Sequence, residues 1–172
     1  MTLKLRSVHY FSSSKVECHM KNTLLDPDAK TAMMARIAKL QPDSPALWGK
    51  MNAAQVLCHL ADQFRMALGE LPVKGEAGFF GRTLMRWLVL AGMPAPKGKV
   101  STMPELDQLT AGTKPTEFEK DRQSLFGYIA IMVSKGSEYA WAAHPVFGKM
   151  GEPEWCRMGW IHLDHHLSQF GM

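Results

Sequence analysis

The sequence predicts an all-α protein, an up-and-down four-helix bundle with a long crossover connection and one short accessory helix. Apolar residues recur at three- and four-residue steps in four separate segments, and capping residues or prolines stand where those segments begin. No β-hairpin signal, internal repeat or low-complexity tract competes with this pattern. Four amphipathic helices in a chain of 172 residues are expected to bury their apolar faces around one core.

The first two predicted helices begin at capping signals. Asp26 followed by Pro27 is typical of an N-cap and a first helical position, and this helix is expected to end before Pro42. Asn52, with Gln55 three residues later, predicts a capping box at the start of the second helix. The apolar stripes of the two helices are Ala29, Met33, Ile37 and Leu40, and then Val56, Leu57, Leu60, Phe64 and Ala67.

The other two helices are predicted in the C-terminal half. Thr116 and Glu119 have capping-box spacing at the start of the third helix, which Gly136 ends. Pro153 is expected at the first position of the fourth helix, which runs to the end of the chain. Prolines and glycines dominate residues 92–115, so we expect a long connection there that serves as a crossover or a lid.

Residues 79–91 form a short, strongly apolar segment between the two pairs of helices. The segment is well under the ~20 residues needed to cross a bilayer. It is expected to be either an accessory helix in the core or a surface at which two copies of the chain meet. Its large apolar residues include Leu84, Trp87, Leu88, Val89 and Leu90.

The composition is that of a globular cytoplasmic protein, with 46% apolar and 21% charged residues. The net charge of +4 is spread along the chain, so we expect no nucleic-acid partner and no polybasic membrane anchor. Cys18, Cys58 and Cys156 are odd in number and lack CxxC spacing. This usage argues against a disulfide framework and a zinc knuckle, and it favours a reducing compartment.

Residues 1–21 are expected to be a poorly ordered N-terminal extension of a single domain that spans residues 22–172. Residues 1–19 contain Lys4 and Arg6 but no continuous apolar region, so we do not expect them to form an ordinary signal peptide. We expect them to be either an extension or the product of a misassigned start codon, since a plausible domain start follows Met20 directly, and we assign them no role.

Three histidines on the second and fourth predicted helices are candidates for one metal site. His162 and His166 stand four residues apart, which places both imidazoles on one helical face about one turn apart. A helical wheel places both at the rim of the core stripe, and it places His59 at the corresponding rim of its own helix. Three neutral histidines suit zinc or nickel and leave one position open for water or substrate. Chance HxxxH spacing and a surface role for His59 remain the alternatives.

Other residues are candidates for supporting roles. Asp62 and Asp164 are candidates for hydrogen bonds that fix the orientation of the ligand rings. His144 and His165 are candidate proton carriers, since an unperturbed histidine titrates near 6.5. His165 points nearly opposite to the ligand pair, and a solvent-exposed or loop-packing histidine is the alternative for both. Cys58 is expected to be a buried, inert thiol.

Two segments, Gln55–Leu60 and His162–Phe170, resemble the DinB/YfiT-like superfamily of bacterial proteins. Trp48-Gly49-Lys50-Met51, the motif His-Pro-Val-Phe-Gly at 144–148 and the ending after Gln169-Phe170-Gly171 are similar to one branch of unknown function. The resemblance covers roughly residues 22–172. It implies a four-helix bundle with one long crossover, often a homodimer, with a divalent metal ion held by His59, His162 and His166.

Characterised members of that superfamily include mycothiol-dependent isomerases and bacillithiol transferases, in which the metal is thought to activate the thiol. The resemblance therefore implies a metal-dependent transferase or hydrolase acting on an unidentified small molecule, with a low-molecular-weight thiol as a candidate cofactor. The alternative is a noncatalytic metal-binding protein or a stress-associated dimeric binding module.

Overall fold

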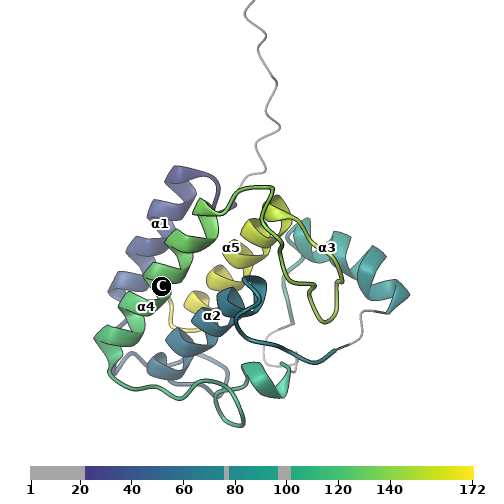
Figure 1. Ribbon diagram of the computed structural model, residues 1–172. Helices are drawn as coiled ribbons and strands as arrows, with labels where there is room; N and C mark the ends of the chain where they lie inside the picture. Colours follow the sequence, from purple (N-terminus) through teal and green to yellow (C-terminus); the bar gives the residue numbers. More distant parts are fainter. Residues whose placement is uncertain (1–21, 76–77, 97–101) are drawn as a thin grey trace, which may run out of the picture.

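The computed structural model describes residues 22–75, 78–96 and 102–172, and this part of the chain is helical (Figure 1). Its only β structure is an isolated bridge between His144 and Gly148. The all-α prediction is therefore confirmed, while the expectation for residues 1–21 concerns a segment outside the described residues. In chain order the elements are α1 (Pro27–Lys39), α2 (Ala53–Ala67), the π-helical turn η1 (Gly81–Met85), α3 (Arg86–Leu90), the 3-10 turn η2 (Pro104–Leu106), α4 (Phe118–Ser134) and α5 (Glu152–Ser168).

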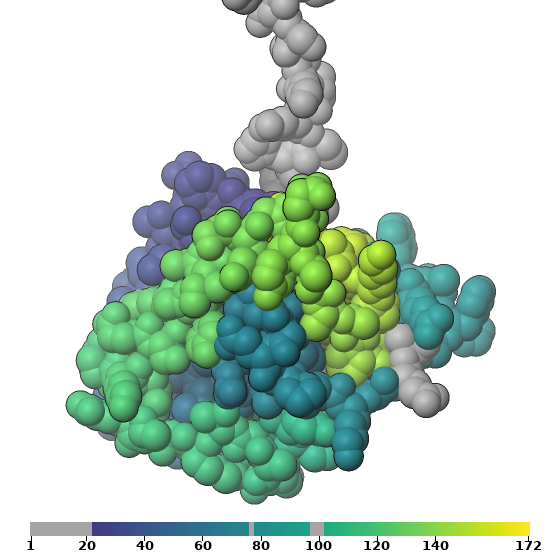
Figure 2. Space-filling view, viewed as in Figure 1, coloured from purple at the N-terminus to yellow at the C-terminus, as the bar shows by residue number. Residues whose placement is uncertain are grey.

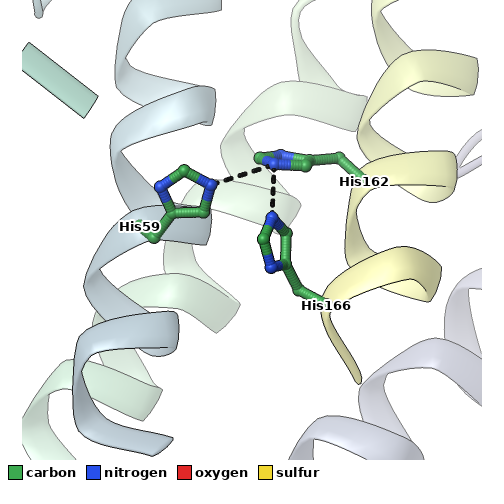
Figure 3. Close-up of side chains that lie close together, drawn as sticks. All are labelled: His59, His162 and His166. Atoms are coloured by element: carbon green, nitrogen blue, oxygen red, sulfur yellow. Dashed lines mark hydrogen bonds between the residues drawn. The ribbon is translucent and has the colours of Figure 1, made fainter. Parts of the chain in front are cut away.

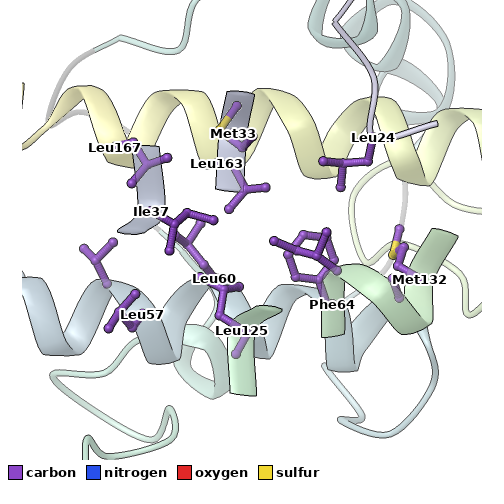
Figure 4. Close-up of a cluster of buried hydrophobic side chains, with 14 of the residues drawn as sticks. Leu24, Met33, Ile37, Leu57, Leu60, Phe64, Leu125, Met132, Leu163 and Leu167 are labelled. Carbon is purple, nitrogen blue, oxygen red and sulfur yellow. The ribbon is translucent and has the colours of Figure 1, made fainter. Parts of the chain in front are cut away.

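The four longer helices, α1, α2, α4 and α5, pack around one core. Both α1 and α2 contact α4 and α5, and the α2–α4 pair has the most extensive contact. Each of these helices thus lies beside two of the others, and the side chains between them form one apolar cluster (Figure 4). A large apolar side chain contributes about 1.5–3 kcal/mol when it is fully buried. The largest fully buried side chains are Trp155, Phe64, Leu24, Met33, Ile37, Leu40, Leu57, Leu60, Leu125, Ile129, Met132 and Leu163.

The predicted caps of the first two helices are confirmed. The Asp26 carboxylate accepts hydrogen bonds from the backbone N–H groups of Asp28, at 2.9 Å, and Ala29, at 3.1 Å. The side chains of Asn52 and Gln55 each accept a 2.9 Å hydrogen bond from the backbone N–H of the other. Both arrangements satisfy N–H groups that the first turn of a helix leaves without partners.

The predicted capping box between Thr116 and Glu119 is wrong. The helix α4 begins at Phe118, and no side chain caps it. Thr116 instead donates its backbone N–H and its hydroxyl to the two carboxylate oxygens of Asp121, at 2.9 Å each. Asp121, in the first turn of α4, therefore binds Thr116 in place of the predicted partner Glu119.

The helix α5 begins one residue earlier than predicted and ends before the end of the chain. It starts at Glu152, so Pro153 is its second residue, and the carboxylate of Glu154 accepts a hydrogen bond from the backbone N–H of Gly151 at 3.0 Å. Its last residue is Ser168, and the chain turns at Gly171, whose φ is +71°.

The apolar segment 79–91 is helical, but the prediction that it belongs to the core is wrong for most of it. No residue of η1 or α3 is buried, and only the end of α3 packs against the core. Figure 2 shows this segment standing out from the rest of the molecule. Its role as a contact surface stays a prediction. The large exposed side chains are Phe79, Phe80, Leu84, Met85 and Trp87.

None of the helices in the described ranges combines the length and the apolar composition that a membrane span requires.

Candidate metal centre

The structure brings His59 of α2 together with His162 and His166 of α5 (Figure 3). The Nε2 atom of His162 lies 3.1 Å from Nε2 of His59 and 2.9 Å from Nε2 of His166. His59 and His166 are buried, whereas His162 is partly buried. The i, i+4 spacing on α5 and the α2–α5 contact together place the three rings around one point.

The other ring nitrogen of His59 faces two oxygen atoms of the long α3–α4 connection. Its Nδ1 lies 2.7 Å from the backbone carbonyl oxygen of Leu106 and 3.1 Å from the side-chain oxygen of Gln108. Both oxygens are acceptors, so this nitrogen carries the proton and donates it.

The Nδ1 atoms of the two α5 histidines also face oxygen atoms. The side-chain oxygen of Gln63, one helical turn after His59 on α2, accepts from Nδ1 of His162. The side-chain oxygen of Gln169 accepts from Nδ1 of His166 at 2.8 Å. Each ring is therefore fixed in the tautomer that leaves Nε2 unprotonated.

Three Nε2 lone pairs thus converge with no proton between them. A divalent ion 2.0–2.1 Å from each nitrogen would place neighbouring nitrogens about 2.9 Å apart at right angles and about 3.3 Å apart at tetrahedral angles. The two separations from His162, 3.1 Å and 2.9 Å, fall within this range, and one ring nitrogen from each of the three histidines lies within 4.8 Å of the others. The donor set and its spacing therefore fit a borderline divalent metal ion, and these side chains could hold one.

The electrostatic surroundings favour the neutral form of all three rings. Burial lowers the pKa of His59, and the carbonyl of Leu106 partly opposes the shift. Burial also lowers the pKa of His166 to about 3 and that of His162 well below its ordinary value, and the neighbouring imidazoles add to both shifts. Because only a neutral imidazole binds a metal ion, protons do not compete for this cluster near neutral pH.

Asp62 does not bond to a histidine, so its predicted direct role in orienting a ring is wrong. Its buried carboxylate accepts hydrogen bonds from the side-chain N–H of Gln108, at 2.8 Å, and from both the backbone N–H and the hydroxyl of Thr113, at 2.9 and 2.8 Å. Arg65 donates to the same carboxylate at 3.0 Å. Asp62 therefore fixes the amide of Gln108, and the oxygen of that amide faces His59.

Three glutamines that support the cluster were missed from the sequence. A signal existed for two of them, since Gln63 stands four residues after His59 and Gln169 three residues after His166. At those spacings a side chain lies on the same helical face as the histidine. Gln108 had no such signal, because it comes from a connection without periodicity.

Asp164 and His165 lie on α5 outside the cluster. Asp164 pairs with Arg36 of α1 at 2.6 Å, so its predicted contact with a ligand ring is wrong. The ring of His165 packs edge-on against Trp48 and against His166, with centroid distances of 4.9 and 5.0 Å. Its role as a proton carrier stays a prediction.

His144 packs within the α4–α5 loop and is not part of the cluster. Its Nδ1 accepts hydrogen bonds from the backbone N–H groups of Val146, at 3.0 Å, and Phe147, at 3.1 Å. The ring stacks on that of Phe147 with a centroid distance of 4.4 Å, and burial lowers its pKa to about 4. The structure thus matches the loop-packing alternative for His144.

The thiols of Cys58 and Cys156 are buried, as expected for Cys58. Burial raises the pKa of each to about 12, and nearby carboxylates add to the shift: Asp121 and Asp62 at Cys58, Glu152 at Cys156. Both thiols stay protonated near neutral pH, so neither is a nucleophile.

The loop before α2 contacts the glutamine that orients His166. Gly49 has a φ of +90°, and a Cβ atom at this position would lie 2.8 Å from the side-chain nitrogen of Gln169. The backbone N–H of Leu47 also donates to the carbonyl of Gln169, at 2.6 Å. Only glycine fits this backbone conformation and this close approach.

Substituting Gly49→Ala should therefore displace Gln169 and lower the affinity for zinc by about tenfold, as is typical when a residue that orients a metal ligand is lost. Competition with a chromophoric chelator measures the affinity. Gly69→Ala is the matched control, because Gly69 has a similar φ of +78° and a Cβ atom added there would meet no atom within 4 Å. Equal losses of affinity in both variants would contradict the role of the contact between Gly49 and Gln169.

The fold and the site geometry define a class of protein. It is an all-helical protein whose trihistidine cluster is suited to a divalent ion. Within that class, residues 20–171 match the family described as "Protein of unknown function (DUF1569)", and the chain belongs to this family. Comparison with curated proteins and with solved structures gave no significant match. The family description names no activity.

Proposed function

We propose that His59, His162 and His166 bind zinc or nickel through Nε2, and that this centre supports a metal-dependent transferase or hydrolase reaction on a small molecule. The proposal rests on one observation, the convergence of three Nε2 atoms on rings whose Nδ1 atoms each face an oxygen acceptor. Packing alone would not require all three rings to carry their proton on Nδ1.

An open coordination position supports a catalytic site. In the part of the chain that the structure describes, the metal-binding group contains the three histidines and no fourth histidine, cysteine or carboxylate. Catalytic zinc sites have three protein ligands and keep the fourth position for water or substrate. When bound there, zinc or nickel would lower the pKa of a coordinated water or thiol toward neutrality.

The nucleophile in this proposal is neither of the two cysteines that the structure describes. Cys58 and Cys156 are buried and protonated, so a water molecule or an external low-molecular-weight thiol takes that role. Gln63, Gln108 and Gln169 hold the ligand rings in place and act as positioning residues.

We further propose that α1, α2, α4 and α5 form a DinB-like four-helix bundle, whose crossover is the long connection between α3 and α4. The closed set of contacts among these helices supports the bundle. The exposed apolar side chains of residues 79–87 support a homodimer, since an exposed apolar patch commonly marks an interaction surface. The same patch favours the alternative function, a noncatalytic dimeric binding module.

Turnover by the metal-loaded protein distinguishes the two functions. Zinc- and nickel-loaded protein is assayed with glutathione, bacillithiol and mycothiol against aryl halides and epoxides, and with aryl esters in water. The proposal predicts turnover that is lost in His162→Ala and kept in Asp164→Ala, because the Asp164 carboxylate pairs with Arg36 and not with the cluster. No turnover with any pair, from protein shown to contain metal, would overturn the catalytic proposal and leave the binding module.

A further inference from the structure

A cavity of about 780 Å³ lies outside the metal centre, between the segment around η1 and the α4–α5 loop. None of the three clustered histidines is among its lining residues. Its volume is within the ~300–1,000 Å³ of small-molecule sites. The residues relevant to ligand chemistry are Val73, Arg82, Arg86, His144, Phe147 and Lys149.

The two segments that line this cavity, η1 and the α4–α5 loop, contact each other. A Cβ atom on Gly81 would lie 2.4 Å from the carbonyl oxygen of Val146, so η1 touches the α4–α5 loop, and Figure 1 shows the two side by side. The loop is held by two 2.8 Å backbone hydrogen bonds between His144 and Gly148 and by the stacking of His144 on Phe147. The cavity is thus framed by packed elements.

All charged residues that line the cavity are cationic. Arg82 and Lys149 are exposed and have no ion-pair partner among the described residues. Arg86 donates its Nε and one terminal nitrogen to Glu154, which leaves its second terminal nitrogen for a ligand. The lining therefore presents more positive charge than the neighbouring carboxylate neutralises.

His144 adds a neutral hydrogen-bond donor. Its Nδ1 accepts two backbone hydrogen bonds, so Nε2 carries the proton. This Nε2–H has no partner in the described ranges of the chain. The polar side chains of the lining therefore all donate, while Val73 and Phe147 supply apolar surface.

From this pairing of donors with an apolar wall, we propose that the cavity binds an organic anion, a phosphate or carboxylate group attached to an apolar body. The guanidinium groups of Arg82 and Arg86 and the ammonium group of Lys149 bind the oxyanion. Charge-assisted hydrogen bonds from such groups are the strongest that this lining can offer. The apolar body packs against Phe147 and Val73. This site is independent of the proposed metal function.

Calorimetric titration with phenyl phosphate, in parallel with phenol and inorganic phosphate, tests the proposal on untagged protein with and without zinc. Phenyl phosphate should bind both forms more tightly than either fragment, and its affinity should fall as salt rises. Arg82→Ala and Lys149→Ala should each weaken binding by about tenfold. Lys120→Ala, an exposed lysine of α4 outside the cavity, should leave the affinity unchanged.

Three results would overturn the proposal. One is equal affinity for phenol and phenyl phosphate, which would remove the role of the anion. Another is unchanged binding in both Arg82→Ala and Lys149→Ala. The last is binding that requires zinc and disappears in His162→Ala, which would place the anion on the metal and would support the metal centre itself.

Discussion

Zinc or nickel, added at about a thousandfold excess over its dissociation constant, should raise the free energy of unfolding by about 4 kcal/mol. The ion binds the folded arrangement of His59, His162 and His166, in which the three Nε2 atoms already face one point. Binding also removes the repulsion among three lone pairs that the metal-free protein holds together. For a chain of 172 residues the melting temperature should rise by roughly 10 °C.

Urea denaturation with and without the ion measures this stabilisation. The His162→Ala variant should show little of it, because two histidines remain and one of the three nitrogens is lost. The His165→Ala variant should keep it, since that ring lies outside the cluster. Equal stabilisation of wild type and His162→Ala would mean that the ion binds elsewhere.

Asp62→Ala should lower the free energy of unfolding by about 3 kcal/mol. The substitution removes a buried carboxylate that accepts four hydrogen bonds, and it leaves the donors of Gln108 and Thr113 without their partner. Because Gln108 then no longer holds its oxygen toward His59, the affinity for zinc should also fall, by about tenfold.

Asp164→Ala is the matched control for this substitution. Asp164 also pairs with an arginine, but its side chain is 42% exposed and that of Arg36 is 24% exposed. Exposed ion pairs contribute at most about 1 kcal/mol, so this variant should lose little stability and no metal affinity. Gln108→Ala should reproduce the loss of affinity seen in Asp62→Ala. If Asp62→Ala lowers the free energy of unfolding by no more than Asp164→Ala does, the carboxylate of Asp62 does not support the cluster.

Local signals predicted the helices well where the interactions lie within one turn. Asp26 and the pair of Asn52 and Gln55 bond to groups two or three residues away, and the structure confirms both caps. The prediction for Thr116 failed because its partner lies farther along the chain. Thr116 bonds to Asp121, five residues away, and not to Glu119, three residues away.

Apolar composition alone did not predict whether residues 79–91 lie in the core or on the surface. A run of large apolar side chains fits a core helix and a surface patch equally well, and the difference depends on what the rest of the chain covers. The four longer helices fill the core with their own side chains, so Phe79, Phe80 and Trp87 stay exposed.

The candidate ligands were predictable, but half of their supporting contacts were not. Helical spacing identified His162 and His166, and the wheel placed His59 at a matching rim. The contacts of Leu106 and Gln108 with His59 depend on the path of the long α3–α4 connection, which no periodicity describes.

Metal content tests the central claim most directly. Elemental mass spectrometry on untagged, zinc- or nickel-reconstituted protein should find about one ion per chain in wild type and in His165→Ala. It should find almost none in His59→Ala, His162→Ala and His166→Ala, each shown by circular dichroism to be folded. Wild-type protein that holds no ion after reconstitution, or single variants that keep the full amount, would contradict the trihistidine site.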